Sequence, residues 1–348
     1  MEHLTNALDL LSQPGLLIRD NVIYYANAAA RGMLLREGES VLPLLGEALP
    51  DFREGAAYLQ LQLGKQRIPA SLTRLPQGDV LVADTQQEQL QAMALVSREL
   101  RGILEPLMNT ADRLFSKIAL SPDPEAREQM ALMNKQLFQL LRMAGNLSMN
   151  VSVLPQMETV NLTGFLEELL DKARQLLEQA GHSLSFTNEA GQVFLGADSQ
   201  LLERAILNIL ANAAKFAPGC RIEVTLRRSG DRVSLVFTDN GPGIPSEVYP
   251  TLFRRYLRQP GLEDSRYGLG LGMALIRAAA AAHAGTVLIT PGSQGGTRVI
   301  LTLSAKQSTS TQLRSPMLRM DYAGGRDHQL VELSGVLPKA VFRSEDIN

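Results

Sequence analysis

A helical repeat between residues 90 and 147 constrains the fold more than any other feature of the sequence. Apolar or small residues recur there at steps of three and four, which puts them in one seam of a long helix. The Ser121-Pro122-Asp123-Pro124 break ends that helix, because proline lacks a backbone N–H and clashes with the preceding turn. A second helix then resumes with its own seam. The first seam contains Leu90, Met93, Ser97, Leu100, Leu104, Leu107, Ala111 and Leu114, and the second contains Met130, Met133, Leu137, Leu140, Ala144 and Leu147.

A single hairpin of this kind buries its two seams poorly, whereas two copies from two chains make a four-helix bundle. We therefore expect residues 86–155 to form a dimerising helical hairpin and the protein to be a homodimer. The alternative is a hairpin that packs within its own chain on a neighbouring domain. Pro106 interrupts the first helix and should bend it.

Residues 1–85 alternate short apolar runs with turn signals, which predicts a small α+β unit. Asp20-Asn21 mark a hairpin turn, and Asn27 has the chemistry of an N-cap. The LLIRDNVIYYANAAARGMLL segment resembles the PAS sensor fold, in which a sequence segment of this kind stands at the start of the sheet. The alternative is a small dimerisation unit without a ligand. We expect helices at Leu4–Leu11 and Ala28–Leu35, and strands at Gly15–Ile18, Val22–Tyr25, Tyr58–Leu63, Ile68–Leu75 and Gly78–Ala83.

Helical and strand patterns are mixed over residues 156–306, and residues 307–348 form a polar linker and a C-terminal tail. Within the tail, Leu330–Val336 has an amphipathic pattern. The fold class expected for the whole chain is α+β and multidomain. In the mixed part we expect helices at Thr163–Leu177, Gln200–Phe216 and Met273–His283, and strands at Ser183–Asn188, Val193–Gly196, Ile222–Arg227, Val233–Asp239, Thr286–Thr290 and Thr297–Leu303.

The composition of the chain limits which binding partners and which cellular location we expect. The 348 residues carry a net charge of −2, so nothing favours a nucleic acid or an anionic membrane surface. No apolar run reaches the roughly 20 residues that span a bilayer, so we expect no membrane insertion. The single cysteine, Cys220, cannot make an internal disulfide, which fits a reducing compartment. The N-terminus lacks the pattern of a secretion signal. We expect a cytoplasmic protein.

Three segments of the mixed part carry candidate binding chemistry. In LLERAILNILANAAKFAPG, Asn208 and Asn212 lie four residues apart and share one helix face, and Lys215 and Phe216 follow near its end. Asparagine oxygens suit a hard cation, lysine meets phosphate, and an aromatic ring packs on a base. Taken alone, this is equally a polar helix face with a lysine at its C-terminus.

The second segment is TDNGPGIP, in which Asp239 ends an apolar strand. A carboxylate there can accept a hydrogen bond from an exocyclic amine such as adenine N6. Gly241 and Gly243 allow the backbone to approach a flat ring, although the segment alone is an ordinary turn.

The third segment, RYGLGLGMALI, places Gly268, Gly270 and Gly272 before a helix, where free N–H groups can hold phosphate. It is neither the G-x-G-x-x-G of a dinucleotide fold nor a P-loop, because Met273 stands at the third glycine's place and no Gly-Lys-Ser follows.

The order and spacing of these segments resemble the GHKL-type ATP-binding domain of sensor histidine kinases from two-component systems, over residues 160–304. The wider group also includes gyrase, a heat-shock chaperone and a mismatch-repair ATPase. The resemblance implies an α/β sandwich in which Asn212, assisted by Asn208, holds Mg²⁺ and Asp239 binds adenine. Arg266-Tyr267 depart from the small residues usual before the glycine loop. The ATP-binding set that it implies is Asn208, Asn212, Lys215, Phe216, Asp239, Gly241, Gly243, Arg258, Gly268, Leu269, Gly270, Leu271, Gly272 and Thr297.

The helical hairpin resembles the dimerisation and phosphoacceptor domain of the same kinases, whose first helix carries Ser-His-Glu-Leu-Arg. Here Arg98 replaces the histidine, within Ser97-Arg98-Glu99-Leu100-Arg101. A guanidinium stays protonated and offers only donors, so it cannot accept a phosphoryl group as a neutral imidazole does. Gly102 stands where the family's phosphatase activity uses a polar residue. Glu99 is left without a partner for its role as a base.

Three hypotheses follow. The first is a pseudokinase that dimerises, binds Mg-ATP and signals by conformation, with a response regulator or an intact histidine kinase as partner. The second is an active kinase that phosphorylates a partner chain in trans. The third is an anti-sigma-type serine kinase, which the long hairpin disfavours because those regulators lack one.

Overall fold

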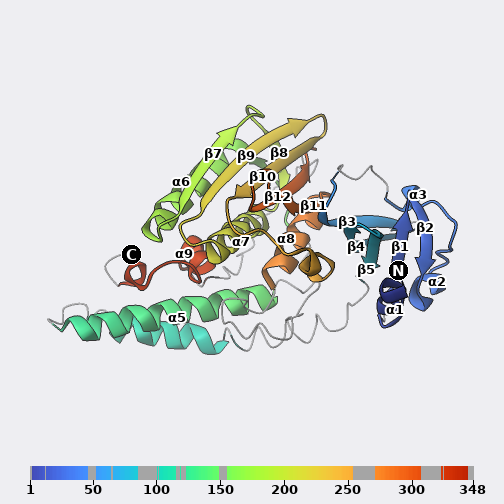
Figure 1. Ribbon diagram of the computed structural model, residues 1–348. Helices are drawn as coiled ribbons and strands as arrows, with labels where there is room; N and C mark the ends of the chain where they lie inside the picture. Colours follow the sequence, from blue (N-terminus) through green and yellow to red (C-terminus); the bar gives the residue numbers. More distant parts are fainter. Residues whose placement is uncertain are drawn as a thin grey trace.

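The computed structural model describes residues 2–11, 13–45, 52–63, 66–84, 100, 102–114, 118, 123–148, 155–253, 271–306, 323 and 325–343. Figure 1 shows the N-terminal elements at one end of the molecule, a larger α/β part beside them, and the long helix α5 along one edge. The mixed α/β fold class is confirmed. No helix within these ranges is both long and apolar enough to cross a membrane.

The N-terminal unit contains the expected helices and strands. Its five strands pair in the order β2-β1-β5-β4-β3, and every pairing is antiparallel. Asn27 is the expected N-cap, because its side chain accepts the N–H of Ala30. The same side chain also accepts the N–H of Gly15 at 3.0 Å and donates to the carbonyl of Leu8 at 2.9 Å, which ties three elements together. The elements are α1 (Glu2–Asp9), β1 (Gly15–Arg19), β2 (Val22–Ala26), α2 (Ala28–Gly32), α3 (Leu42–Leu45), β3 (Gly55–Leu63), β4 (Gln66–Leu75) and β5 (Gly78–Ala83).

The hairpin region has helical backbone at residues 102–114 and in α5 (Pro124–Ser148). The apolar and small side chains of these two helical segments, which include most of the predicted seams, divide into a buried and an exposed set. Leu104, Met108, Ala111, Leu137, Phe138, Leu141 and Ala144 are buried within the chain, and most of them join the core of the α/β part. The intrachain alternative therefore describes one face of these helices. The other face leaves Leu100, Ile103, Leu107, Leu114, Leu132, Met133, Leu140 and Met143 exposed.

The α/β part is a sheet in the order β11-β12-β10-β9-β7, with α6, α7 and α8 packed on it in one core. Only β7 and β9 pair in parallel among these strands. The expected elements are present within a few residues, and the short strand β6 and the helices η1 and η3 were not predicted. The bounds are β6 (Glu158–Asn161), α6 (Leu162–Gln179), β7 (Ser183–Asn188), β8 (Phe194–Ala197), α7 (Ser199–Phe216), β9 (Arg221–Ser229), β10 (Arg232–Asp239), η1 (Ser246–Thr251), α8 (Leu271–Ala282), β11 (Val287–Pro291), β12 (Thr297–Ser304), α9 (His328–Leu333) and η3 (Lys339–Phe342).

The two sheets are joined edge to edge, which the sequence did not predict. Strand β3 pairs antiparallel with β11, with Tyr58 opposite Val287, so ten strands form one sheet. Gly55 makes this approach possible, because a Cβ there would lie 2.1 Å from the carbonyl oxygen of Ile289. Its φ of +136° is also one that side chains rarely adopt.

Candidate nucleotide-binding site

Helix α7 presents the asparagine face that the sequence predicts. Asp198 caps it by accepting the N–H of Leu201 at 3.1 Å, and the apolar positions of the helix are buried. Asn208 is fully buried and Asn212 is half-buried. At the end of the helix, the Lys215 ammonium lies 5.4 Å from the ring centroid of the exposed Phe216. Solvent exposure of these side chains therefore increases along α7 from Asn208 to Phe216.

The start of α8 comes directly against this face. A Cβ at Gly272 would lie 3.0 Å from Asn208 Oδ1 and 3.9 Å from Asn212 Nδ2. The Sδ of Met273 is 4.0 Å from Asn212 Nδ2. A glycine is needed for so close an approach, and the structure thus brings the glycine loop's last residue to both asparagines.

Asp239 is the last residue of β10, and one of its two carboxylate oxygens accepts hydrogen bonds from the chain's own backbone. Its Oδ1 accepts the N–H groups of Gly241 at 2.8 Å and of Thr297 at 3.2 Å. No hydrogen bond from the described residues reaches Oδ2. The carboxylate is half-buried, so this second oxygen is an oriented acceptor at the end of the strand.

Close glycine contacts hold the turn after Asp239 against its neighbours. A Cβ at Gly241 would lie 2.9 Å from Cβ of Ala217, just beyond α7, and one at Gly296 would lie 1.9 Å from the carbonyl oxygen of Asp239. Gly243 has a φ of +76° and approaches Gly296. Asp239 is therefore fixed beside both the end of α7 and the turn between β11 and β12.

The pKa of the Cys220 thiol reflects its burial next to Asp239. Burial, together with the negative charge of Asp239, raises the pKa of the Cys220 thiol to about 11. The backbone N–H of Cys220 donates to His182 Nδ1 at 3.2 Å. Cys220 is thus a protonated, buried residue behind the site and not a nucleophile.

The donor set suits a magnesium ion that arrives with phosphates. No three His, Cys, Asp or Glu side chains of the described residues are grouped closely enough to hold a metal ion. Mg²⁺ commonly keeps water and substrate phosphate ligands and takes only one or two oxygens from the protein. The half-buried Asn212 near the end of α7 can supply one such oxygen.

Several predicted site residues lie outside the described residues. These are Arg98 and Glu99 of the hairpin and Arg258, Gly268, Leu269 and Gly270 before α8, together with the side chain of Leu271. The remaining set forms two groups of contacts in the structure. Gly272 contacts Asn208 and Asn212 of α7, and Lys215 and Phe216 follow at the end of this helix. Gly241 and Thr297 contact Asp239, and Gly243 reaches it through Gly296.

Sequence reasoning missed three charged residues next to Asn208. Arg204 contacts Glu332 of α9, and Arg142 of α5 donates to Asn208. One local signal pointed to the first, because Arg204, Asn208 and Asn212 follow each other at steps of four and share a helix face. Glu332 is a lone acid in the apolar run Leu330-Val331-Glu332-Leu333, which marks an acid that needs a partner when buried.

Comparison with known proteins identifies the domain that carries this site. The family of histidine kinase-, DNA gyrase B- and HSP90-like ATPases matches residues 197–307. The sensor histidine kinase CusS of Escherichia coli is 29% identical over 266 residues, which is 71% of this chain and 53% of CusS. The sensor protein KdpD of Mycobacterium tuberculosis is 29% identical over 227 residues, which is 62% of this chain and 26% of KdpD.

The chain thus matches about half of CusS and a quarter of KdpD. Among solved structures, full-length ShkA in complex with AMPPNP superposes with a TM-score of 0.50 at 20% identity, over 61% of this chain and 45% of ShkA. This likeness shows the shared fold. Residues 197–307 therefore match an ATPase domain of this family, and the chain is similar in sequence to sensor histidine kinases over more than half of its length.

Proposed function

We propose that the protein is a cytoplasmic histidine-kinase-like signalling protein that binds Mg-ATP, forms a homodimer through residues 86–155, and lacks its own phosphoacceptor histidine. The observation that carries ATP binding is the oriented second oxygen of Asp239. The two backbone N–H groups on Oδ1 fix the carboxylate, and Oδ2 is left to accept a hydrogen bond from the adenine amine. Gly241 and Gly243 let the turn after Asp239 pack closely on Ala217 and Gly296, which holds the carboxylate in position.

The other residues supply phosphate and metal contacts in this proposal. Asn212, assisted by Asn208, contributes oxygen ligands to Mg²⁺, and Lys215 approaches the phosphates. Phe216, Gly243 and Thr297 border the base, and Arg258 with the glycine loop from Gly268 to Gly272 completes the phosphate side. The nucleotide supplies the phosphoryl group. The chain's own residues bind and orient it.

The chain's organisation is part of the same proposal. Residues 1–85 are a PAS-like unit, residues 86–155 the dimerising hairpin, residues 156–306 the ATP-binding domain, and residues 307–348 a linker and tail. Arg98 at the phosphoacceptor place supports signalling by conformation, since arginine has no lone pair to offer. A response regulator or an intact histidine kinase is the expected partner, and the lone Cys220 supports a reducing, cytoplasmic location.

A second candidate is a kinase that phosphorylates a partner chain in trans. It is supported by two groups of close contacts, Gly272 with Asn208 and Asn212, and Gly241 and Gly296 with Asp239. A chain whose only defect is a missing acceptor retains the means to transfer phosphate elsewhere.

Calorimetry with Mg-ADP tests the binding site through Asp239→Asn. The asparagine keeps an oxygen for the N–H groups of Gly241 and Thr297 but replaces the other oxygen by an NH₂ donor. We expect binding to weaken by roughly 1.5–3 kcal/mol, about 10- to 150-fold, because a charge-assisted hydrogen bond is lost. Asp231→Asn is the matched control, because Asp231 is exposed just before the same strand begins, and it should bind as the wild type does. Equal affinities of the wild type and Asp239→Asn contradict the adenine role.

A further inference from the structure

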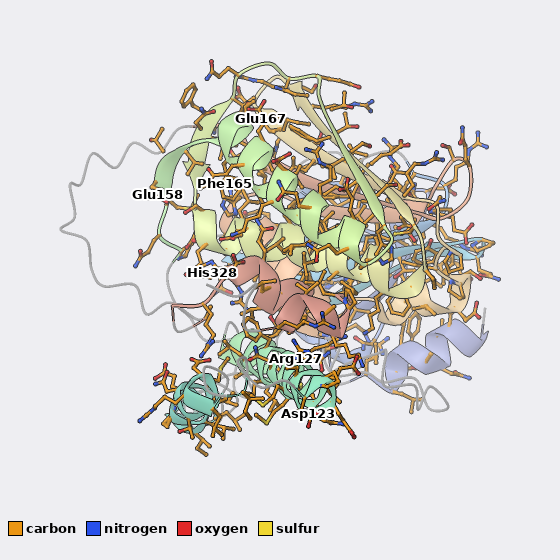
Figure 2. All side chains as sticks on the ribbon, turned by 90° about the vertical axis from the view of Figure 1, so that its left-hand side faces the viewer. Asp123, Arg127, Glu158, Phe165, Glu167 and His328 are labelled. Atoms are coloured by element: carbon orange, nitrogen blue, oxygen red, sulfur yellow. The ribbon has the colours of Figure 1, made fainter. Side chains whose placement is uncertain are left out.

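The C-terminal segment, residues 325–343, lies between α5 and the ATP-binding domain. In Figure 2, α9 begins at the labelled His328 and lies between α5, which carries Arg127, and α6, which carries Phe165. Asp327 caps α9 by accepting the N–H groups of Gln329 and Leu330. The apolar side chains of the segment are buried, namely Leu330, Val331, Leu333, Leu337, Val341 and Phe342.

Polar contacts fasten this segment, hereafter the C-terminal strap, to α5. Asn134 Nδ2 donates to the carbonyl of Phe342 at 3.0 Å, and Lys135 Nζ donates to the carbonyl of Leu337 at 2.7 Å. The rings of Phe138 and Phe342 meet edge to face, with centroids 5.3 Å apart. These contacts recur over successive turns of α5, so the strap follows the helix instead of touching it once.

The opposite side of the strap is fastened to the ATP-binding domain. Gln329 Nε2 donates to the carbonyl of Leu169 in α6 at 3.2 Å. His328 Nδ1 lies 3.2 Å from Glu203 Oε2 in α7, and Lys172 forms an ion pair with Asp327. The strap therefore contacts α5 on one side and helices α6 and α7 of the ATP-binding domain on the other.

Glu332 stands at the centre of this connection and is fully buried. Its Oε1 accepts from Arg204 Nε at 2.8 Å. Its Oε2 accepts from Asn208 Nδ2 at 3.0 Å and lies 3.4 Å from Arg142 Nε. Arg204 in turn donates to Asn146 of α5 at 2.8 Å. One buried carboxylate thus links α5, α7 and α9, and loss of Glu332 would leave both guanidiniums without their counterion.

The same cluster occupies the amide of Asn208. Arg142 Nη2 donates to Asn208 Oδ1 at 3.1 Å, while the amide nitrogen is held by Glu332 and by the carbonyl of Arg204. Gly335 lies close behind, because a Cβ there would be 3.1 Å from Arg142 Nη1. A guanidinium on this oxygen repels a second cation, so Mg²⁺ cannot use the oxygen while Arg142 remains in place.

We propose that the C-terminal strap is an autoinhibitory clamp, in which Glu332 holds Arg142 of α5 on Asn208 and opposes the binding of magnesium nucleotide. The inference rests on the proposed ATP-binding function and adds its regulation. Because coupling is reciprocal, magnesium nucleotide at the site weakens the hold of the strap on α5. The exposed seam of α5 belongs to the proposed dimer, so release of this helix would be transmitted to the partner chain.

The test compares nucleotide affinities of full-length chains by calorimetry, with Mg-ADP and with ADP in EDTA. Arg142→Met removes the guanidinium from Asn208 and leaves the Arg204–Glu332 pair intact. We expect it to bind Mg-ADP at least about 5-fold more tightly than the wild type, with no gain in EDTA. Glu332→Gln should shift the affinity in the same direction. If the Glu332→Gln variant does not fold, the result for Arg142→Met decides the test. Glu128→Gln is the control, because it breaks the exposed Lys339–Glu128 pair of the strap away from Asn208.

Each outcome separates the clamp from the function on which it rests. Wild-type affinity in Arg142→Met, or a gain that does not require Mg²⁺, overturns the clamp and leaves nucleotide binding in place. A gain of similar size in Glu128→Gln also overturns it, because loosening of the strap would then suffice. If neither the wild type nor Arg142→Met binds at roughly millimolar nucleotide, the ATP-binding function fails and the clamp fails with it.

Discussion

At the scale of single residues, the described histidine side chains all have structural roles. His283 Nδ1 donates to the carbonyl of Ala279 at 2.7 Å, its Nε2 accepts the N–H of Asp198 at 3.0 Å, and burial lowers its pKa. Burial also lowers the pKa of His182, which accepts the N–H of Cys220. His328 faces Glu203. Each of these imidazoles makes a hydrogen bond or a polar contact within the ATP-binding domain or between this domain and the strap, and none lies on the hairpin.

We therefore expect no stable self-phosphorylation on histidine when the wild-type chain is incubated with γ-labelled ATP. Arg98→His restores a neutral nitrogen lone pair at the phosphoacceptor place and should restore acid-labile, base-stable label. Arg101→His is the matched control, because it adds a histidine three residues further along and should stay unlabelled. Histidine-bound label on the wild-type chain would show that an acceptor exists elsewhere. Label on an added partner chain, with none on the wild type, would favour the kinase in trans.

At the scale of elements, the hairpin shows which contacts the chain satisfies by itself. Leu104 and Leu137 are buried against their own chain, whereas Leu107 and Leu140 are 49% and 45% exposed. A seam that stays apolar on its outer face is typical of an interface. Full burial of one leucine contributes roughly 1.5–3 kcal/mol, so several on each chain can offset the loss of freedom on association.

The dimer prediction is tested on the outer face alone. Leu107→Asp with Leu140→Asp should give monomers with an unchanged helical circular dichroism signal, because both side chains are exposed in the single chain. Leu10→Asp is the control, since Leu10 is 86% exposed and far from the hairpin in sequence. Light scattering checks the mass at roughly tens of micromolar, where a micromolar affinity would hold the dimer. A monomeric wild type, or a double variant that remains dimeric, contradicts the prediction.

Elements with local signals could be predicted from the sequence, and so could the parts of the site that they carry. The Asp198 cap and the asparagine face define α7, and Asp239 with its glycines marks the end of β10. The missed features depend on contacts distant in sequence. Asn134 and Phe342 are 208 positions apart, and no local pattern ties them together. The amphipathic stretch of the tail and the helix α5 were each predicted, but the contact between them was not.

At the scale of the whole molecule, the ten-stranded sheet joins the N-terminal unit to the ATP-binding domain, and side-chain contacts between the two parts reach η1 and α8. Thr73 Oγ1 of β4 donates to the carbonyl of Tyr249 in η1 at 3.4 Å. The rings of Tyr58 and Phe253 lie 6.1 Å apart, and Arg277 of α8 pairs with Asp84. These contacts fall on η1 and Phe253, which precede residues 254–270 in sequence, and on α8, which follows them, so the N-terminal unit contacts the elements on both sides of that stretch of sequence.

Gly55→Val tests whether this junction holds the two sheets together. The new side chain would meet the carbonyl oxygen of Ile289, and its backbone conformation would add strain of about 1–3 kcal/mol. We expect β3 to separate from β11, with faster amide hydrogen exchange in both strands and in η1, while β9 and β10 keep wild-type protection.

Gly38→Val is the control, because Gly38 also has a positive φ, +87°, but has open space where a Cβ would lie. It places the same side chain on a similarly strained backbone within the N-terminal unit, without a clash at the junction. Exchange should therefore rise in β11 only for Gly55→Val. If β11 and η1 exchange at the wild-type rate in Gly55→Val, the junction is not held by this strand pairing.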